Sequence, residues 1–569
     1  MRSSESNCCG TSRRLVRNTA TCVLASLLAI AASGCRIPQL CCPKPGPVMP
    51  DEFVGTAGGS VPPGADRPEP GTPANAAYLG IEEFFGDPEL FALIVDGLDN
   101  NQELRIRNQE IRIAANEIMA RRSVLFPIVG VGLLSGFDKS SRYTPLGAAE
   151  EQLPYPGGGA FPDPLTNTRM TADLTWHIDV WREFRNARDA ARQRYVEAIE
   201  SRNYLITQIV AETAENYFRL PALDRRLELL DQTIAIQQRS LEAAIALRDA
   251  GQGTELPVQR FLAEVRKNES ERAIVAQQIV EVENRVNFLV GRYPQRVART
   301  SWESIEVDAR MFGAGFPADL LLQRRDIRAA ERELAAAGLD VSVARAHFYP
   351  RVDLTAGIGY EAFDSRFLFD PGSFIAGAAG QLVAPLINRK AIEAEYLNAN
   401  ARQLQAVYEY QRTILQAYTE VVNSLRQVEN YRTSLAIKQE QVRALESSVE
   451  VATNLFQNVE GEYLDVLFSQ RDLLEARIVQ LETRQELISA VVQTYRALGG
   501  GLLLNESGMQ LPELFRSDVL IRTREETVLP APVAPPVEAL PAEEPDPTEI
   551  EIGFAPDASS RRGQTSAVR

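Results

Sequence analysis

The chain has 569 residues, of which 45% are hydrophobic and 24% are charged, so it is long enough to bury a large core. Its formal net charge of −16 argues against a nucleic-acid-binding protein, because such proteins neutralise phosphates with an excess of Lys and Arg. All six cysteines lie within the first 42 residues, which excludes a disulfide framework or a cysteine metal site in the remainder of the chain.

The N-terminus has the pattern of a bacterial export signal. Arginines between positions 2 and 17 precede the apolar run TATCVLASLLAIAAS at 19–33, which is too short for a membrane-spanning helix. The run ends in AASGC, and small residues before a cysteine resemble a bacterial lipoprotein cleavage site, with Cys35 as the lipidated, palmitate-bearing residue. No Asp follows Cys35, which in such lipoproteins favours sorting to the outer membrane. We therefore predict a signal peptide over 1–35; the alternative is an ordinary signal peptide with an incidental cysteine.

Pro-rich segments flank the part of the chain that we expect to fold. Residues 36–87 contain PKPGPVMP and GGSVPPGADRPEPG and are predicted to form a linker from the lipid anchor. Residues 505–569 include VLPAPVAPPVEALPAEEPDPTEIE, a Pro-rich and acidic composition that is typical of a largely disordered tail.

The part between these segments repeats one order of elements: a helix, two strands, a long helix and a returning helix. LFPIVGVGLLSGF at 125–137 resembles FYPRVDLTAGIGY at 348–360. We expect the first repeat to span 88–300, with a helix at about 88–122, strands at about 124–138 and 168–180, and helices at about 181–250 and 255–292. We expect the second repeat to span 301–504, with a helix at about 317–347, strands at about 350–361 and 374–386, and helices at about 387–458 and 462–498.

The long helical runs carry a seven-residue hydrophobic repeat. Apolar residues step by four and three along 414–428 and along 275–289, which indicates coiled-coil packing. Each long run turns at a glycine, Gly253 in the first repeat and Gly461 in the second, into a returning helix. The loops are short, so each pair is predicted to form an antiparallel hairpin.

The strands lead to a prediction about assembly. Apolar residues alternate with small or polar ones through 349–360, which is the two-residue period of a strand with one apolar face. Four strands cannot close a barrel, and an open sheet edge is not tolerated in lipid, so copies of the chain must share a wall. Two copies would give eight strands and three would give twelve; small residues on the inward face favour the wider barrel, namely Gly130, Gly132, Gly357, Gly359 and Gly377. The competing interpretation is a soluble four-stranded sheet that caps a helical rod.

Two longer segments resemble the outer-membrane efflux proteins, or TolC-like exit ducts, and specifically their lipoprotein branch. RRDIRAAERELAAAGLDVSVARAHFYPRVDLTAGIGY at 324–360 is similar to the family's segment that leads into the second strand pair, although Arg325 stands where that branch usually has Pro. YLDVLFSQRDLLEARIVQLETRQELISAVVQTYRALGGG at 463–501 is similar to the family's last helix.

The resemblance implies a mainly α fold with a membrane β-barrel. Long coiled-coil hairpins and four strands per chain would build a twelve-stranded barrel and a periplasmic α-helical tunnel as a homotrimer. Such a duct would sit in outer-membrane lipid and would passively accept drugs or other small molecules from an inner-membrane pump through a periplasmic adaptor protein.

The resemblance also points to a periplasmic aperture at the helix tips. Asp465 matches the first Asp of the family's DVLD segment, whereas Phe468 stands at the second Asp. A carboxylate from each of three chains would narrow the pore and attract cations. An Asp in the first turn of a helix is also favoured by the helix dipole alone, which is the structural alternative.

The chain shows no pattern that indicates an enzyme. Asp173, Asp179 and Asp353 are expected on the inward strand face, where barrel lumens are polar, and nothing resembles a nucleophile with its base. His177 and His347 are the only histidines and lie far apart in sequence, so we expect no metal and no cofactor. Two other functions stay open: an exit duct for a secreted polypeptide, and a lipid-anchored coiled-coil scaffold without a pore.

Overall fold

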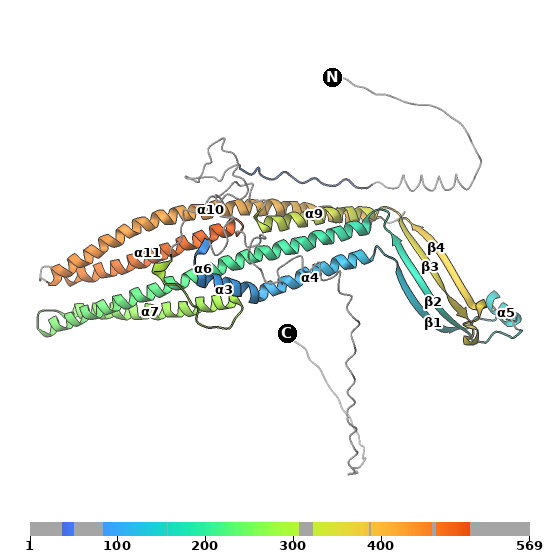
Figure 1. Cartoon of the computed structure of the whole chain (residues 1–569), viewed down its shortest axis with the longest axis horizontal. Helices are drawn as coiled ribbons and strands as arrows, with labels where there is room; N and C mark the ends of the chain where they lie inside the picture. Colours follow the sequence, from blue (N-terminus) through green and yellow to red (C-terminus); the bar gives the residue numbers. More distant parts are fainter. Residues whose placement is uncertain are drawn as a thin grey trace, which may run out of the picture. The chain divides into compact units, whose positions relative to one another are not determined.

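The computed structural model describes residues 37–50, 84–155, 158–305, 323–385, 389–457 and 462–500 (Figure 1). The expected lipidation residue Cys35, the turn glycine Gly461 and the tail at 505–569 lie outside the described residues. The predicted combination of long antiparallel helical hairpins with four strands per chain is confirmed. Among the described residues, no helix combines the length and the apolar character that crossing a membrane requires.

The elements of the first half alternate helices with two strands. They are α3 (Pro88–Asn100), α4 (Gln102–Ser123), β1 (Ile128–Asp138), α5 (Pro145–Gln152), β2 (Leu165–Ile178), α6 (Glu183–Asp249), α7 (Glu255–Val290) and the short 3-10 helix η2 (Trp302–Ser304).

The second half has the same order. It contains α9 (Arg325–Ala346), β3 (Arg351–Ala362), the 3-10 turns η4 (Ser365–Phe367) and η5 (Pro371–Ser373), β4 (Phe374–Val383), α10 (Lys390–Gln457) and α11 (Tyr463–Ala497).

Asn101 divides the single helix that was predicted at 88–122 into α3 and α4. Its backbone is extended, with φ −61° and ψ 125°, and its side-chain oxygen caps α4 by accepting from the amides of Glu103 and Leu104. Its amide nitrogen donates to the carbonyl of Leu289 over 2.8 Å, so the break also fastens α4 to α7. A buried Asn can satisfy both ends of its side chain here, which an uninterrupted helix would not allow.

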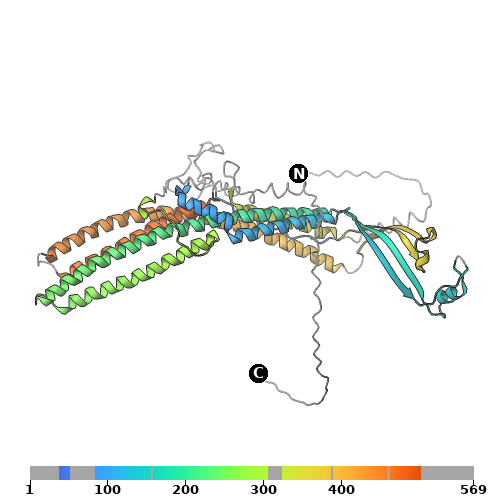
Figure 2. The ribbon, with the colours of Figure 1, turned by 60° about the horizontal axis from the view of Figure 1, so that its bottom comes forward.

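The helices form two antiparallel hairpins, α6 with α7 and α10 with α11, which Figure 2 shows from a second direction. α6 has 67 residues and α10 has 68. Heptad positions on α7 and α10 pack as the seven-residue repeat predicts: the buried side chains include Val275, Val282 and Val286 of α7 and Val421 and Val428 of α10.

The α6–α7 turn contains the predicted Gly253, but the residue with a left-handed backbone is Gly251. Gly251, with φ +73°, follows the last helical residues in the left-handed region, and its amide donates to the carbonyl of Arg248. The amide of Gln252 reaches back to the carbonyl of Leu247, which is the six-to-one bond of a helix-ending glycine motif. The turn therefore needs a glycine at 251, whereas Gly253 has no positive φ.

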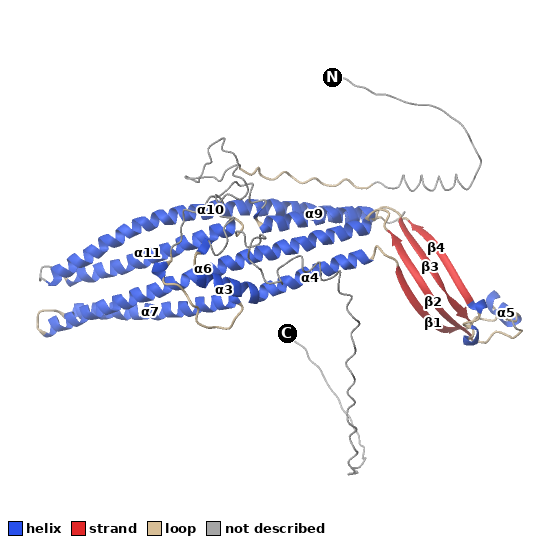
Figure 3. Ribbon diagram, in the orientation of Figure 1, coloured by secondary structure: helices blue, strands red, loops and turns tan. Residues whose placement is uncertain are grey.

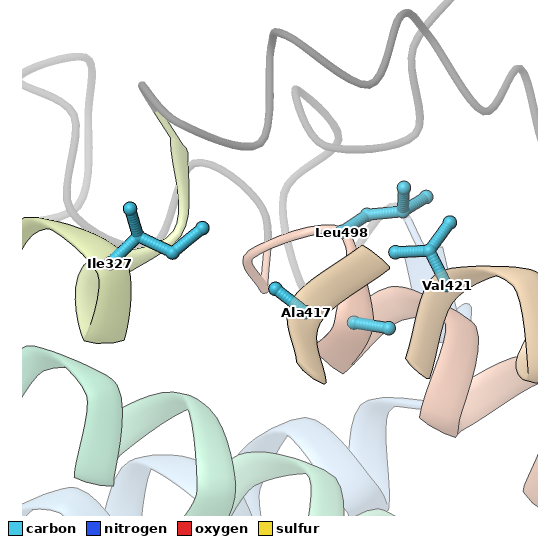
Figure 4. Close-up of a cluster of buried hydrophobic side chains, with 5 residues drawn as sticks. Ile327, Ala417, Val421 and Leu498 are labelled. Carbon is cyan, nitrogen blue, oxygen red and sulfur yellow. The ribbon is translucent and has the colours of Figure 1, made fainter. Parts of the chain in front are cut away.

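A buried arginine ties three helices together in the helical part. Arg324, only 3% exposed, pairs with Asp326 at 2.7 Å and Glu420 at 2.8 Å and donates to the carbonyl of Ala497. Beside it lies a hydrophobic cluster of α9, α10 and the end of α11, part of which is drawn in Figure 4: Ile327, Ala417, Val421, Ala497 and Leu498. A buried charge is tolerated only when it is paired, and these carboxylates hold the pKa of Arg324 above its ordinary value although burial opposes this.

The four strands form one antiparallel sheet in the order β1-β2-β3-β4 (Figure 3). The segment between β1 and β2 contains the short helix α5, which is not among the elements predicted from the sequence. Thr144 caps α5 by accepting from the amide of Gly147, and Pro145 occupies its first turn. These are ordinary helix-start signals, but the helix has only 8 residues and no apolar period to predict it.

Candidate channel-forming surfaces

The strand register divides the sheet into two faces, because directly paired residues of antiparallel strands point to the same side. The polar face has a cross-strand row in which Asp173 pairs with both Gly130 and Gly357, and Gly357 pairs with Gly377. The neighbouring row on the opposite face is apolar and consists of Val131, Ala172, Ile358 and Ala376.

The apolar face is uncovered in the single chain. On β1 the side chains of Val129, Val131, Leu133 and Phe137 are between 65% and 76% exposed, and Leu382 on β4 is 68% exposed. A continuous apolar surface of this kind is unfavourable in water and marks a site that lipid or protein covers.

Aromatic side chains lie at both ends of the sheet. At the helix end, the ring of Trp181 stacks on Tyr349 with centroids 4.7 Å apart and donates its indole N–H to the carbonyl of Pro350 at 2.7 Å. At the loop end, Tyr360 meets Phe374 with centroids 5.9 Å apart. Aromatic belts at both limits of an apolar band are typical of membrane strands, because amphipathic rings suit the headgroup layer.

The glycines of the polar face make room for neighbouring side chains. A Cβ on Gly357 would lie 2.5 Å from Oδ1 of Asp173, and Oδ2 of the same carboxylate accepts from the hydroxyl of Thr171 at 2.7 Å. Gly130, by contrast, has nothing within 4 Å of its Cβ position. On the polar face, the Asp173 carboxylate therefore fills the space that a side chain at position 357 would need, whereas the space above Gly130 is free.

Two of the three predicted inward-facing acids lie on this face, and the third does not. Asp353 bonds to His177 at 2.6 Å across β2 and β3, on the same side as Asp173. Asp179 follows the end of β2, and its carboxylate accepts from the backbone amides of Phe184 and Arg185. The expectation for Asp179 is therefore corrected: it satisfies the free amides at the start of α6, where Arg182 has a left-handed φ of +63°.

Within the part of the chain that the structure describes, both outer strands of the sheet have an edge without a partner strand. β1 and β4 each have one neighbour in the strand order, and β1 pairs with β2 over its whole length. Edges of 11 and 10 residues without bulges or prolines are templates for pairing with another strand.

Asp465, the residue predicted to line the aperture, lies near the tip of the second hairpin. It is exposed in the first turn of α11. It lines a groove between α10 and α11 together with Phe468 and Asp472. Asp472 was not singled out from the sequence, although it lies seven residues after Asp465 and therefore two turns further along the same helix face.

His347 joins three helices next to the sheet. It caps the end of α9, and its two ring nitrogens contact Glu395 of α10 at 3.0 Å and Glu183 of α6 at 3.2 Å. The hydrogen bond to Glu183, followed by that to Glu395, raises the pKa of His347 to about 9 although burial acts in the opposite direction. The imidazolium is therefore the form present at neutral pH.

Residues 37–50 differ from a free linker because they pack along α10. Ile37 and Leu40 lie against a cluster that includes Phe348 and Tyr396. The amide of Cys41 donates to the side chain of Asn400, and the carbonyl of Lys44 accepts from Gln411. Residues 37–50 therefore run along α10 in the same direction as that helix, from Asn400 towards Gln411.

Comparison with known proteins covers most of the described residues. Residues 93–292 and 316–500 match the family model described as outer membrane efflux protein. The chain is 28% identical over 429 residues to the solvent efflux pump outer membrane protein SrpC of Pseudomonas putida, which covers 75% of this chain and 88% of SrpC. It is 24% identical over 433 residues to the probable outer membrane lipoprotein SilC of Salmonella typhimurium, covering 76% and 90% respectively.

The fold also matches a solved structure. The outer membrane protein VceC of Vibrio cholerae superposes with a TM-score of 0.66 at 25% sequence identity, covering 73% of this chain and 97% of VceC.

Proposed function

The chain belongs to the outer membrane efflux protein family, and from this premise we propose that three copies form one exit duct through the outer membrane. One observation carries the proposal: a four-stranded sheet with an exposed apolar face, a polar opposite face and two unpaired edges. Such a sheet becomes stable in lipid when β1 of one copy pairs with β4 of the next, because closure removes every edge. Three copies supply twelve strands, which leaves a lumen behind the glycine-rich polar face.

The helical hairpins continue this duct into the periplasm. Their exposed faces are rich in charged side chains, which excludes them from lipid and suits a water-filled tunnel. A tunnel of this kind receives its cargo from an inner-membrane pump through a periplasmic adaptor protein, and it conducts passively without a catalytic step, metal or cofactor. We assign it small molecules as cargo, which is supported by the similarity to the solvent efflux protein SrpC.

A lipid on Cys35 would anchor each copy beside its own strands. Ile37, two residues further on, packs in the cluster around Phe348, and Phe348 lies three residues before β3 begins. Two residues of chain reach at most about 7 Å, so a lipid on Cys35 would be tethered close to Ile37 and to this cluster. The similarity to the lipoprotein SilC supports the same assignment.

Single-channel recording tests the duct. The purified protein should give stepwise currents in a planar lipid bilayer, and a matched pair of variants tests the assignment of the two faces. Val131→Lys places a charge on the lipid face, which costs about 2–4 kcal/mol at the bilayer centre, and should abolish most channels. Gly130→Lys, one residue away, has free space on the lumen face and should conduct with reduced cation selectivity.

Equal channel yield from the two lysine variants would contradict the assignment of faces. No current from the wild-type protein under any opening condition would contradict the duct itself.

Asp465 is proposed to ring the periplasmic aperture. Asp465→Asn should lower the preference for cations over anions at low salt, because it removes one carboxylate per copy from the narrowest point. The control is Glu255→Gln, the first-turn acid of α7, whose carboxylate pairs with Arg248 at 3.1 Å. Reversal potentials that move as far in the control as in Asp465→Asn would remove the aperture role.

A further inference from the structure

The groove beside Asp465 is lined by apolar as well as acidic side chains. It encloses about 600 Å³, and its walls come from Ser447, Val451 and Leu455 of α10 and from Asp465, Phe468 and Asp472 of α11. Val451 is 54% exposed, while Leu455 and Phe468 are each 42% exposed. In a hairpin whose heptad positions are buried, three large apolar side chains on one open groove form a surface for an apolar ligand.

A cation already lies against the aromatic ring of this groove. The guanidinium carbon of Arg471 is 5.2 Å from the centre of the Phe468 ring, and one of its nitrogens donates to Asp472 at 3.3 Å. The side chains of Arg471 and Asp472 are each nearly half exposed. The ring and the carboxylate therefore act together on a positive charge, and the arginine that they hold can swing into solvent.

The first hairpin lacks this combination at the equivalent positions. Aligning the turn glycines of the repeats, 253 with 461, places Pro257 opposite Asp465 and Arg260 opposite Phe468. Only Asp472 has an acidic counterpart, Glu264. An aromatic ring between two carboxylates is thus a property of the second hairpin and not of the repeat.

We infer that this groove binds amphiphilic organic cations, with the apolar part against Val451, Leu455 and Phe468 and the charge between the ring and Asp472. The role of the groove rests on the proposed duct. If the protein is a duct, the groove would hold such cargo at the aperture before it enters the tunnel. The chemical complementarity itself lies within one chain. The groove combines cation–π attraction, a carboxylate and exposed apolar area that a ligand would bury.

Equilibrium dialysis of tetraphenylphosphonium tests the site, with the same detergent concentration on both sides of the membrane. The wild-type protein should bind the ion saturably, at one site per chain. Phe468→Ala should weaken binding about tenfold and Asp472→Asn about fivefold, because each removes one half of the cation site. Triphenylphosphine oxide, which is neutral, and tetramethylammonium, which lacks apolar area, should both bind much more weakly.

Arg471→Gln should change the affinity for tetraphenylphosphonium in the opposite direction. Removing the resident cation frees the ring and the carboxylate, so this variant should bind tetraphenylphosphonium severalfold more tightly. The matched control is Glu264→Gln on α7, which removes an acid paired with Lys267 and should leave binding unchanged. These substitutions lie on exposed or partly exposed positions, and the helical content of each variant verifies that it folds.

The outcomes separate the site from the duct. The site would be overturned if neither Phe468→Ala nor Asp472→Asn changes the affinity of saturable binding, or if Arg471→Gln weakens binding. A wild-type protein that conducts in bilayers without binding the ion would overturn the site and leave the duct intact. The expected binding pattern in a protein that never conducts would leave the site and contradict the duct.

Discussion

At the residue scale, His347 shows how a few side chains hold the helices next to the sheet. It contacts carboxylates of α6 and α10 while capping α9, so one imidazolium joins three elements. A cation at the C-terminal end of a helix is also favoured by the helix dipole. These contacts could not be predicted from the local sequence, because Glu183 and Glu395 lie 164 and 48 residues away from His347 along the chain.

The contact predicts a pH dependence of stability. The pKa of His347 is raised from an ordinary value of 6.5 to about 9, so the folded state binds the proton more tightly. The resulting stabilisation is fully present below about pH 6.5 and is lost as the pH rises through about 9. Thermal unfolding of the purified protein should therefore show a loss of stability between these limits that is absent in His347→Gln.

His177→Gln is the control, because His177 bonds to Asp353 on the sheet instead of joining helices. Parallel pH curves for the wild type and His347→Gln would show that the imidazolium does not stabilise the fold.

The tip of the second hairpin marks a limit of sequence reasoning at this scale. Asp465 was found through one motif position, and Phe468 was registered only as a departure from that motif. Asp472 could have been identified by following the helical period from Asp465 for two further turns. The contact of Arg471 with the Phe468 ring could not be predicted, because it depends on side-chain conformations and not on spacing.

At the element scale, the strands were the most predictable part of the chain. Their two-residue period gives the apolar face, and the observed register keeps Val131, Ala172, Ile358 and Ala376 on one side. The break between α3 and α4 was not predicted, since Asn101 acts through a contact with Leu289, 188 residues away. α5 was missed because a helix of 8 residues in a Pro-rich segment has no period to detect.

In the α6–α7 turn, the repeat in the sequence predicts Gly253 as the turn glycine, whereas the backbone requires a glycine at position 251. Gly251→Ala should destabilise the hairpin by about 1 kcal/mol, because φ +73° places a Cβ too close to the neighbouring carbonyl. Gly253→Ala should cost less, because the backbone of Gly253 is not left-handed, although an added Cβ would lie 3.3 Å from the amide nitrogen of Arg248. Denaturant unfolding of both variants measures the difference.

If Gly253→Ala proves the more damaging substitution, the left-handed residue of the turn has been wrongly assigned.

At the scale of the whole molecule, function depends on surfaces that the single chain leaves unfinished. The apolar face of the sheet is exposed and the edges of β1 and β4 are unpaired, so the protein's stability in lipid belongs to the assembly and not to one chain. The number of strands per chain was predictable from the sequence. The number of copies was inferred from barrel closure and the size of the inward residues, which is a weaker physical constraint.

The most direct test of the account is the mass of the assembly in a lipid bilayer. Native mass spectrometry of the protein released from nanodiscs should give three chains per particle, with no stable single chain at low concentration. A stable monomer in the bilayer would contradict the shared barrel wall, and with it the duct.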